Sequence, residues 1–404
     1  MTLLRPAPRV PAARSALDPI TALPSRGSSR LDPVLVVAVL LLCAAGSVLV
    51  YSATKPRLQA AGSDPESLIL RHLVSIALGL ALAGALAGSD YRRLRMYTPP
   101  VYLVAVGGLA LVFSPLGATV NGSHSWIFVG GFSAQPVEFA KLALCLGLAL
   151  LLAERREGTG VFSHHEVFLA VGLAAIPVGL VALQPDLGSI MVLVAVLAGV
   201  LVVAAVPARW IVGLAVTALL GAFVAVQANL LSEYQVDRFA AFANPALDPD
   251  GVGYNANQAR IAIGSGRLTG TGLFHGTQTG GQFVPEQHTD FIFTVAGEET
   301  GFLGAGTLVV LFALLVWRGA LIARRAPDLF GALVATAVVC WFGFQVFENV
   351  GMTLGLMPIT GLPLPFVSYG GTAMLANLAA VGLLLNIHAA SGSSRAWRPI
   401  RREL

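Results

Sequence analysis

Charged residues are scarce in this 404-residue chain, where Asp, Glu, Lys and Arg make up 11% of the residues and hydrophobic residues 56%. A soluble domain carries about 25% charged residues. A water-exposed globule could not cover its surface with so few charges. The scarcity therefore excludes an ordinary soluble protein and indicates that lipid is the solvent for most of the chain.

Cysteine is also rare, and the common catalytic and metal-binding spacings are missing. Cys43, Cys145 and Cys340 lie far apart in apolar stretches, which is typical of small core residues rather than of a disulfide or metal set. The chain has no Ser-His-Asp spacing, no His-x-x-x-His and no Cys-pair signature. Its net charge of +4 comes without a basic face or a nucleic-acid-binding motif, so we expect no nucleic-acid partner.

Long uncharged runs are what the chain does have. A membrane-spanning helix needs about 20 mainly apolar residues, and ten segments meet that requirement. The predicted spans are 33–53, 70–88, 98–117, 134–153, 167–184, 187–206, 210–231, 290–317, 329–348 and 372–390. Residues 349–394 carry no charge, but as one helix they would be more than twice as long as the hydrocarbon core is thick. Pro358, Pro363 and Pro365 are predicted to break this stretch.

Basic residues between the spans predict the orientation. Most of the 25 Lys and Arg residues fall on the side of the two termini, in short clusters. These are Arg5, Arg9, Arg14, Arg26, Arg30, Arg92, Arg93, Arg95, Arg155, Arg156, Arg209, Arg318, Arg324, Arg325, Arg395, Arg398, Arg401 and Arg402. The positive-inside rule then puts both termini in the cytoplasm. Three segments, about 118–135, 232–289 and 349–371, are left on the outside.

The sequence thus predicts an all-α membrane protein with about ten transmembrane helices. Residues 1–32 are rich in Pro, Ser, Ala and Arg, and we interpret them as a disordered cytoplasmic tail. Residues 33–390 form the polytopic domain, with the large outer loop at 232–289 between spans seven and eight. Residues 391–404 form a basic cytoplasmic tail.

The large outer loop has two interpretations. Its Gly264-Ser265-Gly266 and Gly270-Thr271-Gly272 lack the Gly-Lys-Ser/Thr ending of a P-loop, so they do not predict a nucleotide site. They fit a turn-rich connector. Arg238, Arg260 and Arg267 favour the alternative, contact with the phosphate of a lipid headgroup, because the arginine fork matches phosphate oxygens.

The loop ends in Pro285–Phe293, at the mouth of an apolar span. Asp290 there is either a helix N-cap or a general base at the bilayer edge, with Glu286 and His288 nearby. Partial desolvation would raise the pKa of a carboxylate in that position toward neutrality. The two interpretations are compatible.

Other polar residues in or beside the spans have structural and functional interpretations. Glu298 and Glu299 lie too deep for idle surface charges, and we expect them to hydrogen-bond to neighbouring helices. Asp186, in Gln184–Gly188, is either an outer turn residue or a second acid near the site. Glu138 and Lys141, at i, i+3 spacing, form either a structural ion pair or a cation site for pyrophosphate.

Two further outer residues are candidates for substrate contact. Trp126 is either an interfacial anchor or a surface on which a sugar stacks. Ser368 lies in Gly361–Gly371, whose prolines prevent a helix. Irregular backbone beside a membrane commonly lines a cavity.

These segments together resemble the SEDS family of envelope proteins, which includes RodA and FtsW. The resemblance extends over nearly the whole chain from the first span to the last. Within the family, residues 261–266, 276–279 and 355–361 are more similar to RodA. Val137, Ser189 and Arg267 depart from the usual family residues. The motifs that carry the resemblance are Asn121-Gly122 with Trp126, Gln135–Glu138 with Lys141, Gln184–Gly188, Pro285–Phe293 with Gly297–Glu299, and Gly361–Gly371.

The resemblance implies a peptidoglycan glycosyltransferase of the cell membrane that polymerises lipid II on the outer face, for rod-shape elongation. It implies a class B penicillin-binding protein as cross-linking partner and a divalent cation, Mg²⁺ or Mn²⁺, although no metal ligands can be named. It also implies that Asp290 is essential.

The chemistry of such a reaction fits the residues. A sugar hydroxyl that attacks an anomeric carbon needs a carboxylate to accept its proton, and the departing pyrophosphate needs positive charge. We therefore interpret Asp290 as the base and Arg238, Arg260 or Lys141 as candidate phosphate contacts. A flippase for the lipid-linked precursor is the first alternative, since ten spans with intramembrane charges also suit a transporter. A non-catalytic scaffold is the second.

Overall fold

The computed structural model describes residues 31–120, 122–129, 132–159, 163–228, 238, 242 and 251–391. Both predicted tails lie almost entirely outside the described residues, as do Asn121 and much of 229–250. Arg238 and Phe242 are the described residues within that last stretch.

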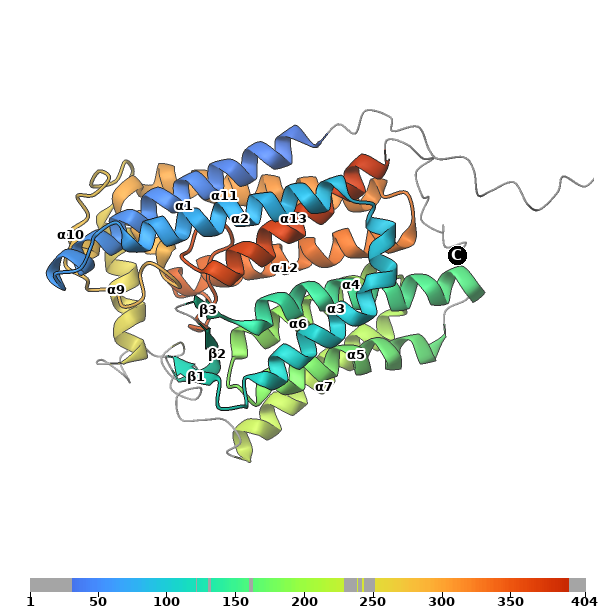
Figure 1. Ribbon diagram of the computed structural model, residues 1–404. Helices are drawn as coiled ribbons and strands as arrows, with labels where there is room; N and C mark the ends of the chain where they lie inside the picture. The colour runs from blue at the N-terminus through green and yellow to red at the C-terminus, as the bar shows by residue number, and fades with distance from the viewer. Residues whose placement is uncertain are drawn as a thin grey trace, which may run out of the picture.

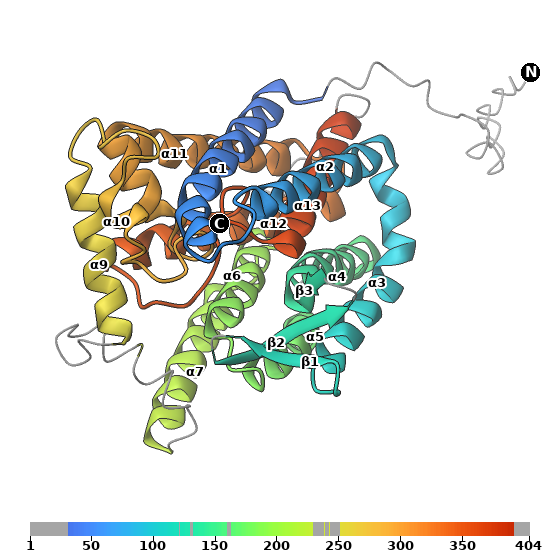
Figure 2. The same cartoon turned by 60° about the vertical axis from the view of Figure 1, so that its left-hand side comes forward.

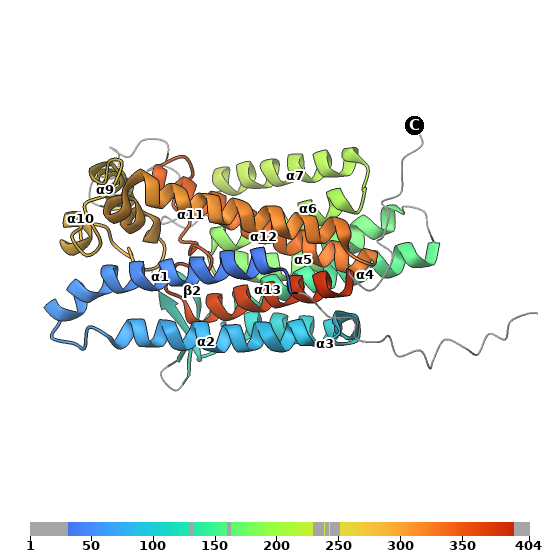
Figure 3. The ribbon, with the colours of Figure 1, turned by 90° about the horizontal axis from the view of Figure 1, so that it is seen from above.

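Ten long helices overlap one by one with the ten predicted spans, within the described part of the chain, and the third of them, Tyr91–Leu111, begins and ends six or seven residues earlier than predicted. They run alongside one another in a bundle (Figures 1 and 3). They are α1 (Pro33–Ala60), α2 (Ser67–Gly88), α3 (Tyr91–Leu111), α4 (Pro136–Thr159), α5 (His164–Ala182), α6 (Leu187–Val203), α7 (Ala208–Gln227), α11 (Ile292–Arg325), α12 (Leu329–Leu354) and α13 (Gly371–Ser391).

Seven of the described helices are long and apolar enough to cross a membrane. Among the ten, α6 and α7 have shorter apolar parts, and α3, which begins with the polar run Tyr91-Arg92-Arg93, does not meet this requirement either. The described chain begins and ends at the same end of the bundle (Figure 1), as an even number of crossings requires. Ten crossings and cytoplasmic termini stay predictions.

The centre of the bundle consists of α4, α12 and α13, each 72–78% buried over its apolar window, whereas the corresponding window of α2 is 22% buried. A helix that is apolar all round is suited to such an interior. The chain breaks between α12 and α13 as predicted. α12 ends with Gly355 in the left-handed region, at φ +71°, and residues 355–370 are irregular.

A small antiparallel sheet was not predicted. β1 (Gly117–Val120), β2 (Ser123–Val129) and β3 (Phe132–Ala134) pair in the order β1-β2-β3. The sheet lies at the end of the bundle away from the described chain ends (Figure 1), the end that comes forward in Figure 2. Its strands are too short for a clear alternating pattern in the sequence. The hydroxyl of Ser123 donates to the carbonyl of Gln184 over 2.8 Å, which ties the sheet to the turn before α6.

The described part of the large loop is folded. It contains α9 (Val252–Ser265) and the four-residue α10 (Thr277–Gly280), at the same end as the sheet (Figure 1). Gly301 kinks α11 with φ +64° and ψ −166°. A Cβ built on Gly266 would lie 1.9 Å from the carbonyl oxygen of Gly297, and one on Gly270 would lie 2.1 Å from that of Glu299. These glycines therefore permit backbone contact between the loop and α11.

Candidate active site

Asp290 lies in the turn that precedes α11. Glu286 begins this turn with φ +50°, and its carbonyl accepts hydrogen bonds from the backbone N–H of Thr289 (3.1 Å) and Phe291 (3.3 Å). Phe291, rather than Asp290, occupies the N-cap position of α11. The N-cap interpretation of Asp290 is therefore wrong, because the turn places the residue one position before the cap. The Asp290 side chain is partly exposed.

The backbone of Asp290 is fixed by α12. The side-chain Nδ2 of Asn349 donates to the carbonyl of Asp290 and to the carbonyl of Leu362, each over 2.7 Å. One buried amide thus joins two segments that lie far apart in the sequence. It holds the turn before α11 against the irregular segment after α12.

Arg238 and Asp290 meet at Gly361. A Cβ built on Gly361 would lie 3.2 Å from Oδ2 of Asp290 and 3.5 Å from Nη2 of Arg238. The other guanidinium nitrogen, Nη1, donates to the carbonyl of Thr360 over 2.8 Å. The structure thus brings together the two residues that the sequence proposed as base and phosphate contact. Gly361, with φ +78°, leaves room for both.

Desolvation and the charges around Asp290 together raise the pKa of its carboxyl group to about 8. Burial is the largest cause, and the negative charge of Glu286 is the next. Arg238 opposes them, while Glu348 on α12 and Asp186 before α6 raise the pKa further. A carboxyl group with a pKa near neutrality is suited to exchange protons with a substrate at physiological pH.

His288 belongs to an aromatic stack beside the same turn. Its ring lies 5.8 Å from the ring of Tyr369, which in turn lies 6.1 Å from the buried ring of His72 on α2. The backbone N–H of Tyr369 donates to the carbonyl of His288 over 2.9 Å. Burial lowers the pKa of His288, Arg57 lowers it further and Glu286 opposes the shift.

Asp186 is the N-cap of α6, where it accepts hydrogen bonds from the backbone N–H (3.0 Å) and the hydroxyl (2.8 Å) of Ser189. This favours the turn interpretation, and the negative charge of Asp186 is also one of those that raise the pKa of Asp290. A Cβ on Gly188 would lie 2.7 Å from Leu362 and 3.1 Å from Thr360. Gln184–Gly188 therefore packs on the irregular segment.

Glu138 and Lys141 form a buried ion pair of 2.8 Å within α4. Lys141 is fully buried, also donates to Oε1 of Gln345 over 3.1 Å, and lies over the ring of Trp341. Groups of the protein therefore surround the ammonium, which favours the structural interpretation of the pair over pyrophosphate contact.

Glu299 hydrogen-bonds to a neighbouring helix as expected, whereas Glu298 instead binds the large loop. Glu298 accepts hydrogen bonds from the backbone N–H groups of Gln278 and Thr279, at 2.7 and 2.8 Å. Glu299 accepts one from the hydroxyl of Ser52 on α1. Both carboxylates are buried, so their role is to attach α10 and α1 to the first part of α11.

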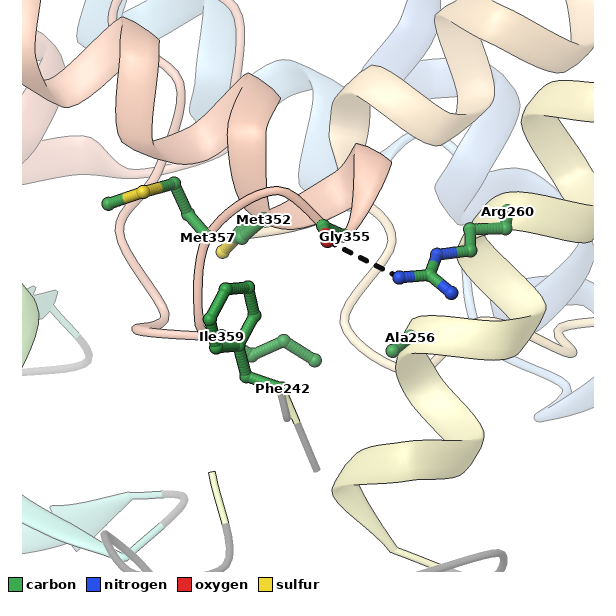
Figure 4. A pocket seen from close by; sticks show the side chains of 7 residues that line it. All are labelled: Phe242, Ala256, Arg260, Met352, Gly355, Met357 and Ile359. Atoms are coloured by element: carbon green, nitrogen blue, oxygen red, sulfur yellow. Dashed lines mark hydrogen bonds between the residues drawn. The ribbon is translucent and has the colours of Figure 1, made fainter. Parts of the chain in front are cut away.

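The remaining candidates occupy other positions. Arg260 donates to the carbonyl of Gly355 at the end of α12 over 3.3 Å, beside a small pocket (Figure 4). The Ser368 hydroxyl accepts from the backbone N–H of Leu364 over 2.8 Å and so braces its own segment. Trp126 lies in β2, opposite Ala118, and is partly exposed.

No group of three or more His, Cys, Asp or Glu side chains in the described residues could hold a metal ion. Mg²⁺ is often bound by one or two carboxylates together with substrate phosphates, so the requirement for a cation stays a prediction.

Glu348 and Asn349 were missed from the sequence. Both are fully buried near the end of α12 and contact the segment that carries Gly361. A signal existed, since a carboxylate and an amide inside an apolar span are functional candidates by default. They belonged to none of the motifs considered.

Comparison with known proteins identifies relatives over most of the chain. The family model of FtsW, RodA and SpoVE, described as cell cycle protein, matches residues 33–393. Stage V sporulation protein E of Bacillus subtilis is 37% identical over 357 residues, covering 88% of this chain and 96% of that protein. Peptidoglycan glycosyltransferase MrdB of Escherichia coli K12 is 36% identical over 89% of this chain and 93% of its own length.

Solved structures are similar as well. A chain from a peptidoglycan synthase complex, studied for how polymerization and crosslinking are coordinated, has a TM-score of 0.73 and 34% identity, covering 89% of this chain and 98% of that one. RodA of Thermus thermophilus has a TM-score of 0.65 and 32% identity over 89% of this chain and 96% of its own. The chain belongs to the FtsW, RodA and SpoVE family, which is the SEDS family that its motifs resemble.

Proposed function

We propose that this membrane protein is a peptidoglycan glycosyltransferase that polymerises lipid II into glycan strands, with Asp290 as the catalytic base. The observation that carries the proposal is a carboxyl group with a pKa of about 8 that meets the guanidinium of Arg238 at Gly361. The relatives named peptidoglycan glycosyltransferase support the reaction class.

In the proposed reaction, an acceptor sugar hydroxyl attacks the anomeric carbon of the donor. The new glycosidic bond forms as the bond from that carbon to the lipid pyrophosphate breaks. The ionised Asp290 carboxylate accepts the hydroxyl proton. Arg238 stabilises the negative charge that develops on the pyrophosphate oxygens, for which its planar fork of donors is suited.

The site is proposed to face the outside of the cell membrane, at the headgroup level. The sheet, α9 and α10 lie at the end of the bundle away from the described chain ends, which the arginine clusters assign to the cytoplasm. The lipid tails of both substrates can then stay in the bilayer while their sugars reach Asp290. A class B penicillin-binding protein is the proposed partner. This proposal is supported by the similarity of the chain to one from a peptidoglycan synthase complex that coordinates polymerization and crosslinking.

Purified protein with labelled lipid II tests this function. We expect glycan ladders from the wild-type chain, with its partner present, and none from Asp290→Ala. Transport of lipid II across vesicles without polymer would favour a flippase instead. Neither polymer nor transport under any condition would favour a scaffold.

A further inference from the structure

Glu348 is a buried carboxylate that the proposed reaction does not use. It lies on α12, is fully buried, and accepts a hydrogen bond at Oε1 from the hydroxyl of Thr360. Its other oxygen, Oε2, has no hydrogen-bond partner among the described residues. Burying a carboxylate with one oxygen unpaired costs free energy. We therefore expect its contacts to give Glu348 a role in the site.

Thr360 connects this carboxylate to the site. Its side chain donates to Glu348, and its backbone carbonyl accepts the 2.8 Å hydrogen bond from Nη1 of Arg238. The next residue, Gly361, is the point at which Arg238 and Asp290 meet. A rotation of the peptide between residues 360 and 361 would therefore change the direction in which the guanidinium points.

Other hydrogen bonds from α12 hold this segment at later residues, where Asn349 donates to the carbonyl of Leu362 and Gln345 donates to that of Pro363. Asn349, next to Glu348, holds Leu362 and the backbone of Asp290. The two neighbouring polar residues thus fix different parts of the site. Asn349 fixes the acid, and Glu348 fixes the peptide to which Arg238 is bound.

We propose that Glu348 and Thr360 are positioning residues that orient Arg238 toward Asp290 through the Thr360 carbonyl. Neither touches substrate in this account. The inference rests on the proposed function, because its readout is the polymerisation reaction. Loss of their hydrogen bond should therefore change kcat and the pKa of Asp290. It should leave the affinity for lipid II unchanged.

The test compares Thr360→Val, which has nearly the same shape without the hydroxyl, with Thr360→Ser, which keeps the hydroxyl. We expect Thr360→Val to lower kcat by about 100-fold, the cost of a misplacement near 1 Å, with a much smaller change in KM. Thr360→Ser should restore most of kcat. Thr336→Val is the matched control, because Thr336 is equally buried on α12 but donates within its own helix to Ala332.

The pH dependence separates positioning from general loss of structure. Four charged groups act on Asp290, from four parts of the chain: Glu286 in its own turn, Glu348 on α12, Asp186 before α6, and Arg238. Thr360→Val leaves all four of these residues in place and removes the hydroxyl that donates to Glu348. If it misdirects Arg238, the group that opposes protonation, the midpoint of the pH–rate profile moves to higher pH. An unchanged midpoint together with wild-type kcat would overturn the proposal.

Glu348→Gln and Glu348→Leu provide a second route if Thr360→Val does not fold. The glutamine side chain would keep an oxygen that accepts the Thr360 hydrogen bond, so Glu348→Gln should retain at least about a third of kcat. Leucine has no acceptor, so Glu348→Leu should lower kcat by about 100-fold, as Thr360→Val does. Equal loss in both would overturn the positioning role. Absence of polymer from the wild-type chain would instead contradict the proposed function itself, so the two failures are distinguishable.

Discussion

At the scale of single residues, the site depends on one carboxyl group whose ionisation is set by its neighbours. Asp290 could be predicted from the sequence because it stands at the edge of an apolar run within a long motif. Its partner could not be assigned from spacing, since Arg238 contacts Thr360 across 122 positions of the chain. Arg238, Arg260 and Lys141 looked equivalent in the sequence, and only the fold separates them.

The first prediction concerns the pH profile of polymerisation. Because the base must be ionised, the rate should rise with pH and level off above about 8, the pKa of Asp290. Arg238→Gln removes the charge that lowers this pKa, so the midpoint should move to higher pH. Arg325→Gln, an exposed arginine in the last turn of α11, is the control and should leave the midpoint unchanged. A profile that falls between pH 6 and 8 would contradict the base role.

The second prediction concerns stability. The pKa of Asp290 is raised from 3.8 to about 8 on folding, so between these values the folded protein holds a proton that the unfolded chain releases. The free energy of unfolding contributed by this group therefore falls as pH rises from about 4 to 8. Asp290→Asn has no such dependence.

Thermal unfolding in detergent at a fixed scan rate measures this difference. The Tm of Asp290→Asn should exceed that of the wild type by more at pH 8.5 than at pH 5. If the Tm of the two proteins changed with pH in parallel, Asp290 would have the same pKa in the folded and the unfolded chain, which would contradict this prediction.

At the scale of elements, hydropathy predicted every long helix, because a run of about 20 apolar residues has few other solutions. The small sheet and the kink at Gly301 were not predicted. β1, β2 and β3 are short strands whose residues show no strong alternation. The kink arises because Gly270 and Gly301 approach backbone to backbone, a contact between segments that spacing does not reveal.

The third prediction concerns the ion pair inside α4. Lys141→Met leaves the carboxylate of Glu138 buried without its cation, and should destabilise the protein by about 3–5 kcal/mol. The double variant Glu138→Leu/Lys141→Met removes both charges and should recover most of that loss. Chemical or thermal unfolding of the wild type, Lys141→Met and the double variant measures these differences in stability. A double variant less stable than Lys141→Met would show that the pair has another role.

At the scale of the whole molecule, the arrangement of spans determines on which side of the membrane the chemistry occurs. The turn between α1 and α2 lies at the end of the bundle with α9 and α10, whereas the last turn of α4 and the first turn of α5 lie at the end with the described chain ends (Figure 1). The orientation rests on the arginine clusters, several of which lie outside the described residues.

The fourth prediction tests that orientation. In a variant with Cys43, Cys145 and Cys340 replaced by Ala, a single cysteine at the exposed Ser63 should react with a membrane-impermeant thiol reagent in intact cells. A single cysteine at the exposed Ser163 should react only after the membrane is opened. The reverse pattern would place Asp290 in the cytoplasm and contradict the proposed site of action.

The most direct test of the catalytic role of Asp290 separates binding from turnover. With purified protein and labelled lipid II, Asp290→Asn should bind lipid II with an affinity near that of the wild type and lose about 10²–10⁴-fold in the rate of polymerisation, the usual contribution of a positioned base. Turnover by Asp290→Asn at the wild-type rate would contradict the account.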